Sequence, residues 1–298
     1  MGSESLPPKP ACSIVKGFNH QKTSAFLGTC ILDRQLIRQN FDISTWLLMG
    51  ATLQTAIFLL PIRPVFALAP AVLVLAYRFV RTVLMCVGML QNPYMKDLVP
   101  GEHTARYPPS PGTGKEGGNE DVCLIILPAR SNHPLGMLAP GFRELGVHFR
   151  NMIFDLDEKA PENGFLGGSA FQNTSDRDSS CEVMNLMYFR SHEHLQAFAH
   201  SAVHRQGWDW WTKNRKDFGH IGISHEVYSV PAGRWETIYM NYHPAGFGAT
   251  NHLVTDKDGE KRWAGSLVDA SKGRFRTAPG RMGLPAATGK ENEKYYEV

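Results

Sequence analysis

The sequence predicts an α+β fold, a ferredoxin-like β-α-β-β-α-β sheet preceded by an N-terminal hydrophobic helical hairpin. Apolar runs with a proline-rich break between them fill residues 44–91. The stretch 100–120 is rich in Pro, Gly and Ser, which is typical of a linker. Strand-like and helix-like patterns then alternate through 121–250 in the order of the split βαβ arrangement. We therefore expect the main folded domain at 121–250, with a polar segment at 1–43 and a polar, poorly ordered tail at 251–298.

The composition and the absent motifs narrow the function. The 298 residues carry a formal net charge of only +3, which gives no reason to expect nucleic-acid binding. The five cysteines are scattered and form no CxxC pair, so neither a disulfide framework nor a cysteine zinc site is expected. No GxGxxG, GxxxxGK[ST] or GxSxG motif occurs in a suitable context. We therefore expect neither NAD, FAD nor ATP, and no serine hydrolase.

The apolar stretch 44–91 favours membrane association. It reads WLLMGATLQTAIFLL, then PIRP, then VFALAPAVLVLAY, and no polar stripe interrupts either run. A hairpin with its turn at 61–64, a single kinked span and a pair of buried helices in a soluble core all fit these lengths. For the hairpin, the positive-inside tendency places both ends on the cytoplasmic side of the membrane, which we expect to be the endoplasmic reticulum. The flanking cations are Arg34, Arg38, Arg78 and Arg81.

The elements of the main domain follow from periodicity. The run VCLIILPAR predicts a buried strand at 122–130, and apolar residues at helical spacing predict a helix at 141–157. A glycine-rich strand (164–173), a loop (175–180), a third strand (181–191), a long helix (192–215), a fourth strand (221–231) and a fifth (235–242) complete the series. Helices cover one face of such a sheet, so the other face needs a cover. A second copy of the chain is the expected cover, which predicts a homodimer.

The second helix carries an unusual combination of side chains. His200, His204, Trp208 and Trp211 gather on the side opposite its apolar residues. Exposed clusters of this kind mark contact surfaces, which a substrate, a cofactor, the partner subunit or another segment of the chain would cover. His200 and His204 stand one turn apart, as haem or metal ligands can. No HExxH, facial-triad spacing or cysteine ligand accompanies them, and we expect no metal.

The third and fourth strands supply candidates for chemistry. His225 shares a face with Ile221, Ile223 and Val227 by alternation, which predicts a buried, neutral imidazole able to accept a proton. A core histidine satisfied by one hydrogen bond explains the same pattern. Glu226 points the other way. Arg190, on the face that also carries Tyr188, could anchor an oxyanion or form a plain salt bridge with a glutamate.

Two long segments resemble a known family. The stretches YFRSHEHLQAFAHSAVHRQGWDWW and HIGISHEVYSVPAGRWETIYMN are similar to fungal and bacterial proteins typified by a fumagillin-pathway monooxygenase. That family is linked to the antibiotic-biosynthesis-monooxygenase superfamily of dimeric α+β barrels, and the resemblance covers roughly 121–251. It implies a monooxygenase that tailors a polyketide or terpenoid, without flavin or metal. The substrate would then supply the electrons, and the protein would exclude water and stabilise a carbanion or enolate.

Residue type and strand parity, rather than the resemblance, suggest individual roles. His225 would be the base, Tyr188 a wall of the pocket, and Asn185 and Arg190 would hold substrate oxygens. Further substrate contacts are expected from Trp208, Trp211, Trp235, His200, His204 and Glu226. Three alternatives remain: a cofactor-free cyclase, isomerase or dehydratase, a haem enzyme using His200 or His204, and a non-catalytic carrier of an apolar metabolite.

Overall fold

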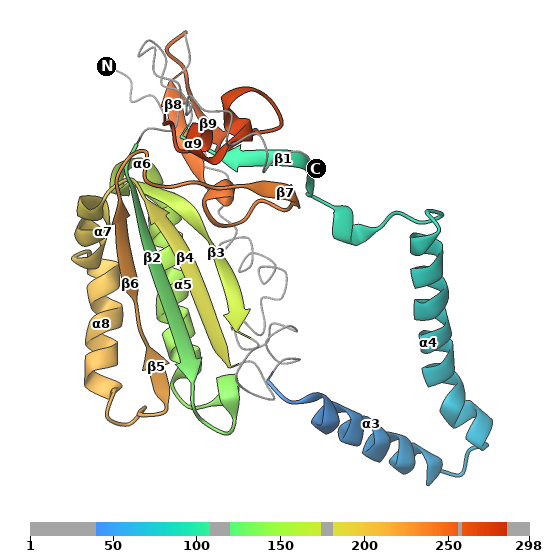
Figure 1. Ribbon diagram of the computed structural model, residues 1–298. Helices are drawn as coiled ribbons and strands as arrows, with labels where there is room; N and C mark the ends of the chain where they lie inside the picture. The colour runs from blue at the N-terminus through green and yellow to red at the C-terminus, as the bar shows by residue number, and fades with distance from the viewer. Residues whose placement is uncertain (1–39, 108–119, 174–180, 256–257, 285–298) are drawn as a thin grey trace.

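The computed structural model describes residues 40–107, 120–173, 181–255 and 258–284 (Figure 1). The predicted polar segment before residue 40, the predicted loop at 175–180, most of the predicted linker and the end of the tail lie outside these ranges.

The central sheet has the predicted ferredoxin-like topology. Its strands are β2 (Val122–Ser131), β3 (Phe165–Asn173), β4 (Glu182–Phe189), β5 (Ile221–Ile223) and β6 (Glu226–Val230). The order is β3-β4-β2, and both β5 and β6 pair with the remaining edge of β2. Every pairing is antiparallel. The predicted α+β fold class is therefore confirmed.

Helices cover one face of this sheet and build the core there. They are α5 (Phe142–Glu158), the short α6 (Ala160–Asn163), α7 (His192–Ala199) and α8 (Ala202–Asn214) (Figure 1). Buried side chains interlock between the two layers, among them Ile153 and Leu156 from α5 and Phe198 from α7, against Met187 and Phe189 of β4. Alternation along β2 and β4 sends their odd-numbered residues into this core and their even-numbered residues to the other face.

The long helix predicted at 192–215 is in fact two helices. α7 ends at Ala199, and α8 begins at Ala202 because Ser201 takes the N-cap position and its hydroxyl accepts the His204 N–H at 3.3 Å. The predicted fourth strand is also broken, since Ser224 and His225 separate β5 from β6. The interruption between α7 and α8 changes the direction of side chains that one long helix would have aligned, whereas β5 and β6 pair with β2 in one continuous register.

A second, smaller sheet lies across one end of the central sheet. It consists of β1 (Val99–Ala105) between β7 (Tyr239–Tyr242) and β10 (Leu267–Asp269), beside the hairpin of β8 (Asn251–Thr255) and β9 (Lys261–Gly265). Short helical turns η4 (Gly246–Ala249), η5 (Gly273–Arg276) and α9 (Ala278–Arg281) complete this region. Thus β1 occupies part of the stretch expected to be a linker, the predicted fifth strand joins the small sheet, and the tail expected to be poorly ordered contains strands.

The hydrophobic N-terminal segment forms two helices that stand away from the domain. They are α3 (Ile43–Phe58), capped by Asp42, and α4 (Pro64–Cys86), whose Pro70 lies within the helix. Gln54 donates to the Ala67 carbonyl near the turn, and beyond it the two helices diverge (Figure 1). Their apolar side chains are almost all exposed. Of the described helices, α4 alone is long and apolar enough to cross a membrane. The turn η2 (Pro93–Met95) leads on to β1, and η3 (Gly136–Leu138) follows β2.

Candidate active site

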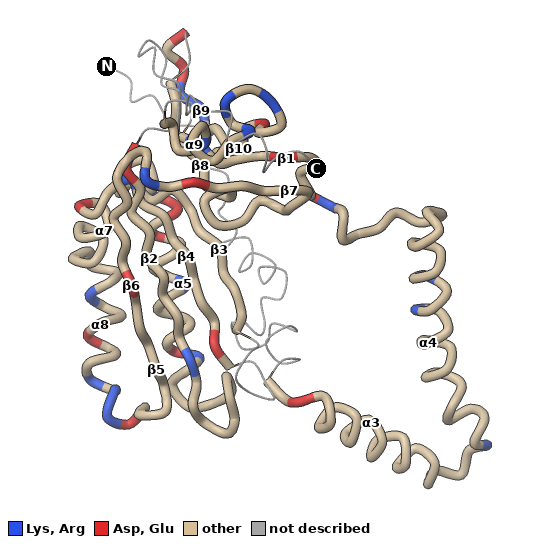
Figure 2. Tube along the Cα trace, viewed as in Figure 1, with Lys and Arg blue, Asp and Glu red and all other residues tan. Residues whose placement is uncertain are grey.

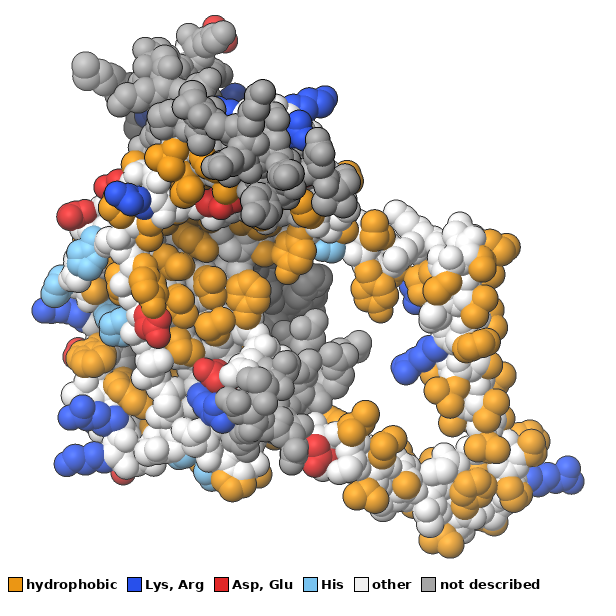
Figure 3. Space-filling view, in the orientation of Figure 1, with side chains coloured by type: hydrophobic (Ala, Val, Ile, Leu, Met, Phe, Trp, Pro, Cys, Tyr) orange, Lys and Arg blue, Asp and Glu red, His pale blue; other side chains and the backbone are white. Residues whose placement is uncertain are grey.

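The face of the central sheet that the helices leave uncovered is apolar, and we call it the open face (Figure 3). The strand register arranges its side chains in rows. One row runs Tyr228, Leu124, Tyr188 and Gly167, the next Glu226, Ile126, Leu186 and Ser169, and the third Pro128, Met184 and Phe171. Most of these side chains are half-buried or exposed although they are large and apolar. An apolar floor of this kind suits a ligand or a second protein surface.

Charge is sparse on the open face and lies at its margins (Figure 2). At the end of the sheet near η3, Glu182 accepts from Asn173 at 2.9 Å and pairs with Arg130 at 3.4 Å. In the edge strand β6, the Tyr228 hydroxyl donates to the Glu226 carboxylate, and this bond is the chief cause that raises the pKa of Tyr228. Glu226 is thus a carboxylate set beside apolar side chains.

An aromatic cap closes the opposite end of the open face. Phe247, on η4, is the centre of this cap, with ring centroids 5.3 Å from Tyr188, 5.5 Å from Tyr107 and 4.9 Å from Trp235. Ser169 holds the loop in place, because its hydroxyl accepts the Gly246 N–H at 2.9 Å. Gly246 permits the close approach, since a Cβ there would lie 3.3 Å from the Tyr188 Oη.

Burial keeps Tyr188 protonated. Burial raises the pKa of Tyr188 to about 12, nearby Tyr239 adds to the effect, and a hydrogen bond with the Phe247 backbone opposes it. A neutral phenol at the boundary between the apolar floor and the cap can donate a hydrogen bond to a developing oxyanion. Glu226 can accept a proton from a molecule lying on the same face, which places an acceptor and a donor around one apolar floor.

The structure divides the residues that the sequence suggested into two groups. Tyr188 and Glu226 lie on the open face, and Trp235 lies in its aromatic cap. Arg190 follows β4, where its charge acts on Tyr107 in the same cap. Asn185, in contrast, is buried on the helix side, paired across the sheet with Leu127 and Ala170. Asn185 therefore does not lie in one site with Arg190, although the sequence suggested that it would.

His225 is exposed, not buried among apolar side chains as predicted. Alternation itself holds across the break between β5 and β6, but this is an edge strand, and Ile223 and Val227 on the same face are also exposed. The register of β5 and β6 with β2 places His225 opposite Leu127, on the helix side of the sheet edge. His225 therefore lies apart from Tyr188 and the open face.

The remaining histidine and tryptophan candidates also lie in the helix layer. His200 is an exposed residue at the end of α7, whereas His204 belongs to α8 and packs against Phe198 with ring centroids 5.4 Å apart. Because the helix is interrupted between them, the two histidines do not share a continuous helical face, as the haem hypothesis required. Burial chiefly lowers the pKa of His204, and the charges of His200 and His225 add to this. Trp208 is exposed and Trp211 half-buried on α8.

Sequence reasoning missed several residues of the open face and its cap. Ser169 lies in a glycine-rich strand, where glycine has no side chain to show the alternation of polar and apolar residues. Phe247, Tyr107 and His252 lie in segments expected to be loop, linker and tail. In the cap, the rings of Tyr107 and His252 lie 4.6 Å apart. The one available signal was the aromatic content of these segments, which is high for solvated loops.

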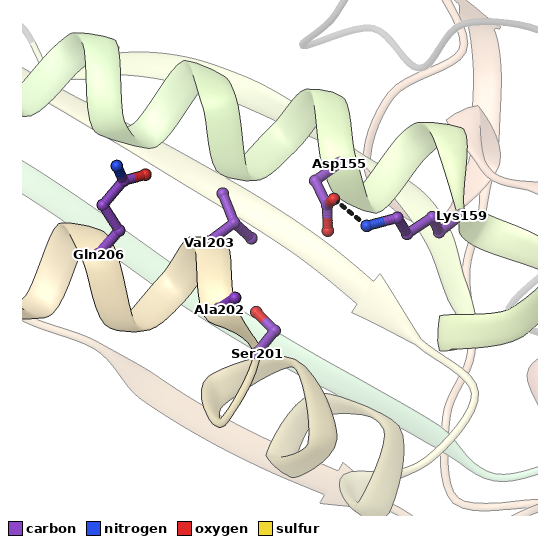
Figure 4. Close-up of a pocket in the computed structure, with 6 residues that line it drawn as sticks. All are labelled: Asp155, Lys159, Ser201, Ala202, Val203 and Gln206. Atoms are coloured by element: carbon purple, nitrogen blue, oxygen red, sulfur yellow. Dashed lines mark hydrogen bonds and ion pairs between the residues drawn. The ribbon is translucent and has the colours of Figure 1, made fainter.

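A groove of about 550 Å³ lies between α5 and α8, on the helix side (Figure 4). Its lining includes the Asp155–Lys159 ion pair and the side chains of Ser201, Val203 and Gln206. None of its residues belongs to the open face, and its carboxylate and ammonium groups already neutralise each other. Elsewhere, among the residues described by the structure, no three His, Cys, Asp or Glu side chains are placed to hold a metal ion.

Comparison with known proteins gives a consistent result. A family model described as Monooxygenase af470-like matches residues 122–247. The curated protein Monooxygenase af470 of Aspergillus fumigatus is 34% identical over 246 residues, which cover 82% of this chain and 88% of that protein.

The solved structures that resemble this chain are more distant. An aldoxime dehydratase in complex with butyraldoxime is 16% identical, with a TM-score of 0.36, over 47% of this chain and 41% of its own. SnoaB, a cofactor-independent oxygenase from Streptomyces nogalater, is 13% identical, with a TM-score of 0.25, over 36% of this chain and 91% of its own.

Proposed function

Because the chain belongs to the monooxygenase af470-like family of oxidoreductases, we propose that it oxygenates a small apolar metabolite on the open face of its sheet. The metabolite would be a polyketide or terpenoid of secondary metabolism, and the reaction would use neither flavin nor metal. The proposal rests on one observation: the apolar open face carries one carboxylate, Glu226, and one buried phenol, Tyr188.

These groups suit a reaction in which the substrate supplies the electrons. Glu226 removes a proton from an acidic C–H group of the substrate, and the Tyr188 hydroxyl donates a hydrogen bond to the enolate oxygen. The carbanion adds O₂ and takes up a proton, which gives a hydroperoxide. Loss of water leaves a carbonyl, so that a CH₂ group and O₂ become C=O and H₂O. One oxygen atom enters the product and the other leaves as water.

Such chemistry requires that water be kept from the carbanion. The aromatic cap shields one end of the open face, but the rest of the face is not covered within one copy of the described chain. We propose that a second copy covers it, which would make the enzyme a homodimer with its sites between the sheets.

The proposal also places the enzyme at a membrane. Helix α4 is exposed along its length and long enough to span the hydrocarbon core, while α3 is as apolar but shorter. We propose that both helices insert into the endoplasmic reticulum membrane and that the domain faces the cytoplasm. An enzyme held there would meet an apolar metabolite where it concentrates.

The test is turnover of candidate polyketide or terpenoid intermediates under ¹⁸O₂, using the full chain purified in mild detergent. We expect product that is heavier by one ¹⁸O atom. Glu226→Gln should lower the rate by roughly 100-fold or more, because it removes the base. Glu144→Gln makes the same change on the outer side of α5 and should leave the rate unchanged.

Other outcomes would point to other functions. A product of unchanged mass would replace oxygenation with cyclisation or isomerisation, and a product lighter by one water would indicate dehydration. Tight binding of the intermediate with no turnover would indicate a carrier. An intense Soret band in the visible spectrum of the purified protein would reveal haem and overturn the cofactor-free mechanism.

A further inference from the structure

The two places where the hydrophobic helices join the domain both carry exposed apolar side chains. At the end of α4, the chain passes through η2 to β1, and Tyr94 and Met95 project from η2. Met240 and Tyr242 project from the neighbouring strand β7 with 64% and 53% of their surface exposed, and Tyr94 is 79% exposed. We call these four residues the upper patch.

The upper patch is held together by the fold although its halves are far apart in sequence. Val99 of β1 pairs with Tyr242 of β7, and the His243 imidazole is bonded to the Lys96 carbonyl at 2.8 Å. Tyr239, the first residue of β7, turns its hydroxyl inward and donates to the Ala245 carbonyl. Alternation therefore sends the next residue, Met240, away from the small core, opposite Glu102 of β1.

A second patch lies where the chain leaves the domain for α3. Asn40 is buried against the loop after β2, where it bonds to the Leu135 carbonyl and to the Met137 N–H. Leu135 and Leu138 of this loop are exposed around that anchor, and we call them the lower patch. Only two residues separate Asn40 from the first residue of α3.

We infer that both patches rest on the surface of the lipid bilayer into which α3 and α4 insert, so that the catalytic domain is seated on the membrane and not merely tethered to it. The inference rests on the proposed membrane insertion of these helices. Exposed tyrosines such as Tyr94, which follows the end of α4, are typical of membrane interfaces. The fold brings the other patch residues next to the two helix connections, through the Val99–Tyr242 pair and the Asn40–Leu135 hydrogen bond. A bilayer is the partner because the chain itself leads from each patch into an apolar helix.

The positions of the patches also fix the orientation of the domain. The lower patch follows the end of β2, and the upper patch lies at the Val99 end of the small sheet, whose Ala105 end packs near Val122 at the beginning of β2. The ten residues of β2 separate these ends by roughly 33 Å. Both patches can touch one bilayer only if the line that joins them runs along the membrane surface.

The experiment uses the full chain reconstituted in phosphatidylcholine vesicles, with the photoreactive residue p-benzoylphenylalanine placed in turn at positions 242, 94, 138, 79 and 208. Mass spectrometry then detects lipid adducts after irradiation. We expect adducts at 242, 94 and 138, and at 79 within α4. Position 208 is the control, because Trp208 is 59% exposed but lies in the helix layer, away from both patches, and should give none.

Each other outcome removes a defined part of the inference. Adducts at position 79 without adducts at 242, 94 and 138 would show that the helices insert while the domain hangs free, which overturns the seating and leaves the membrane anchor. Adducts at only one patch would overturn the parallel orientation. No adduct at position 79 would overturn membrane insertion itself, and the seating with it.

Discussion

Burial sets the ionisation of three tyrosines beside the open face. Tyr188, Tyr239 and Tyr107 line the aromatic cap, and burial is the largest cause that raises the pKa of each. Their phenols therefore stay neutral where an exposed tyrosine would begin to ionise. For Tyr188 this neutrality is functional in the proposed reaction, because only the protonated hydroxyl can donate to an enolate.

The raised pKa of Tyr188 predicts a loss of stability in alkali. The unfolded phenol ionises near 10.0, whereas the folded one holds its proton to about 12. Its contribution is complete below about pH 10 and is lost as the pH rises to about 12. We expect Tyr188→Phe to reduce the fall in unfolding free energy between about pH 8 and pH 12 by on the order of 2 kcal/mol. Urea unfolding of both proteins at each pH measures this.

The comparison at about pH 8 separates this effect from ordinary packing. There Tyr188 is protonated in both states, so the difference between Tyr188→Phe and the parent protein reports the packing and hydrogen bonding of the hydroxyl and not its ionisation. If the two proteins lose stability in parallel as the pH rises, Tyr188 does not retain its proton in the folded state.

At the scale of elements, breaks in regular structure decide where functional side chains point. Ser201 divides the predicted long helix and sets the direction of α8 against α5. The N-cap is functional only while a side-chain oxygen accepts the His204 N–H.

Ser201→Ala should therefore lower the free energy of unfolding by about 1 kcal/mol, because the N–H at the start of α8 loses its acceptor. Ser201→Thr retains an acceptor and should recover most of this loss. Chemical denaturation of the three proteins provides the measurement. Equal stability of all three would mean that the hydroxyl does not cap α8.

Periodicity predicted the central sheet because its strands are long, local in sequence and strongly apolar. It also assigned Tyr188 and Glu226 correctly to faces, since parity holds within an unbroken strand. It failed for the burial of His225 because alternation gives the face of a strand but not what covers that face, and this edge strand is exposed at Ile223 and Val227. It missed β1, whose sequence VPGEHTA contains Pro and Gly and whose partners β7 and β10 lie more than a hundred residues away.

On the scale of the whole molecule, the uncovered side of the sheet is the largest feature that one copy of the domain leaves unexplained. Its centre is apolar, and Glu226 and Tyr228 on the edge strand are exposed. The small sheet covers one end only. A second copy would cover the rest and would exclude water from the proposed site.

This arrangement predicts a dimer that a single charge disrupts. Leu124 lies between Tyr188 and Tyr228 on the open face and is only half-buried, so Leu124→Asp should leave the fold intact while placing a carboxylate in the dimer contact. Light scattering that separates protein mass from detergent mass should give a dimer for the parent protein and a monomer for the variant. Gln206→Glu adds the same charge at an exposed position of the helix layer, away from the open face, and should remain dimeric. A monomeric parent protein with full activity would show that the open face serves its substrate without a partner copy.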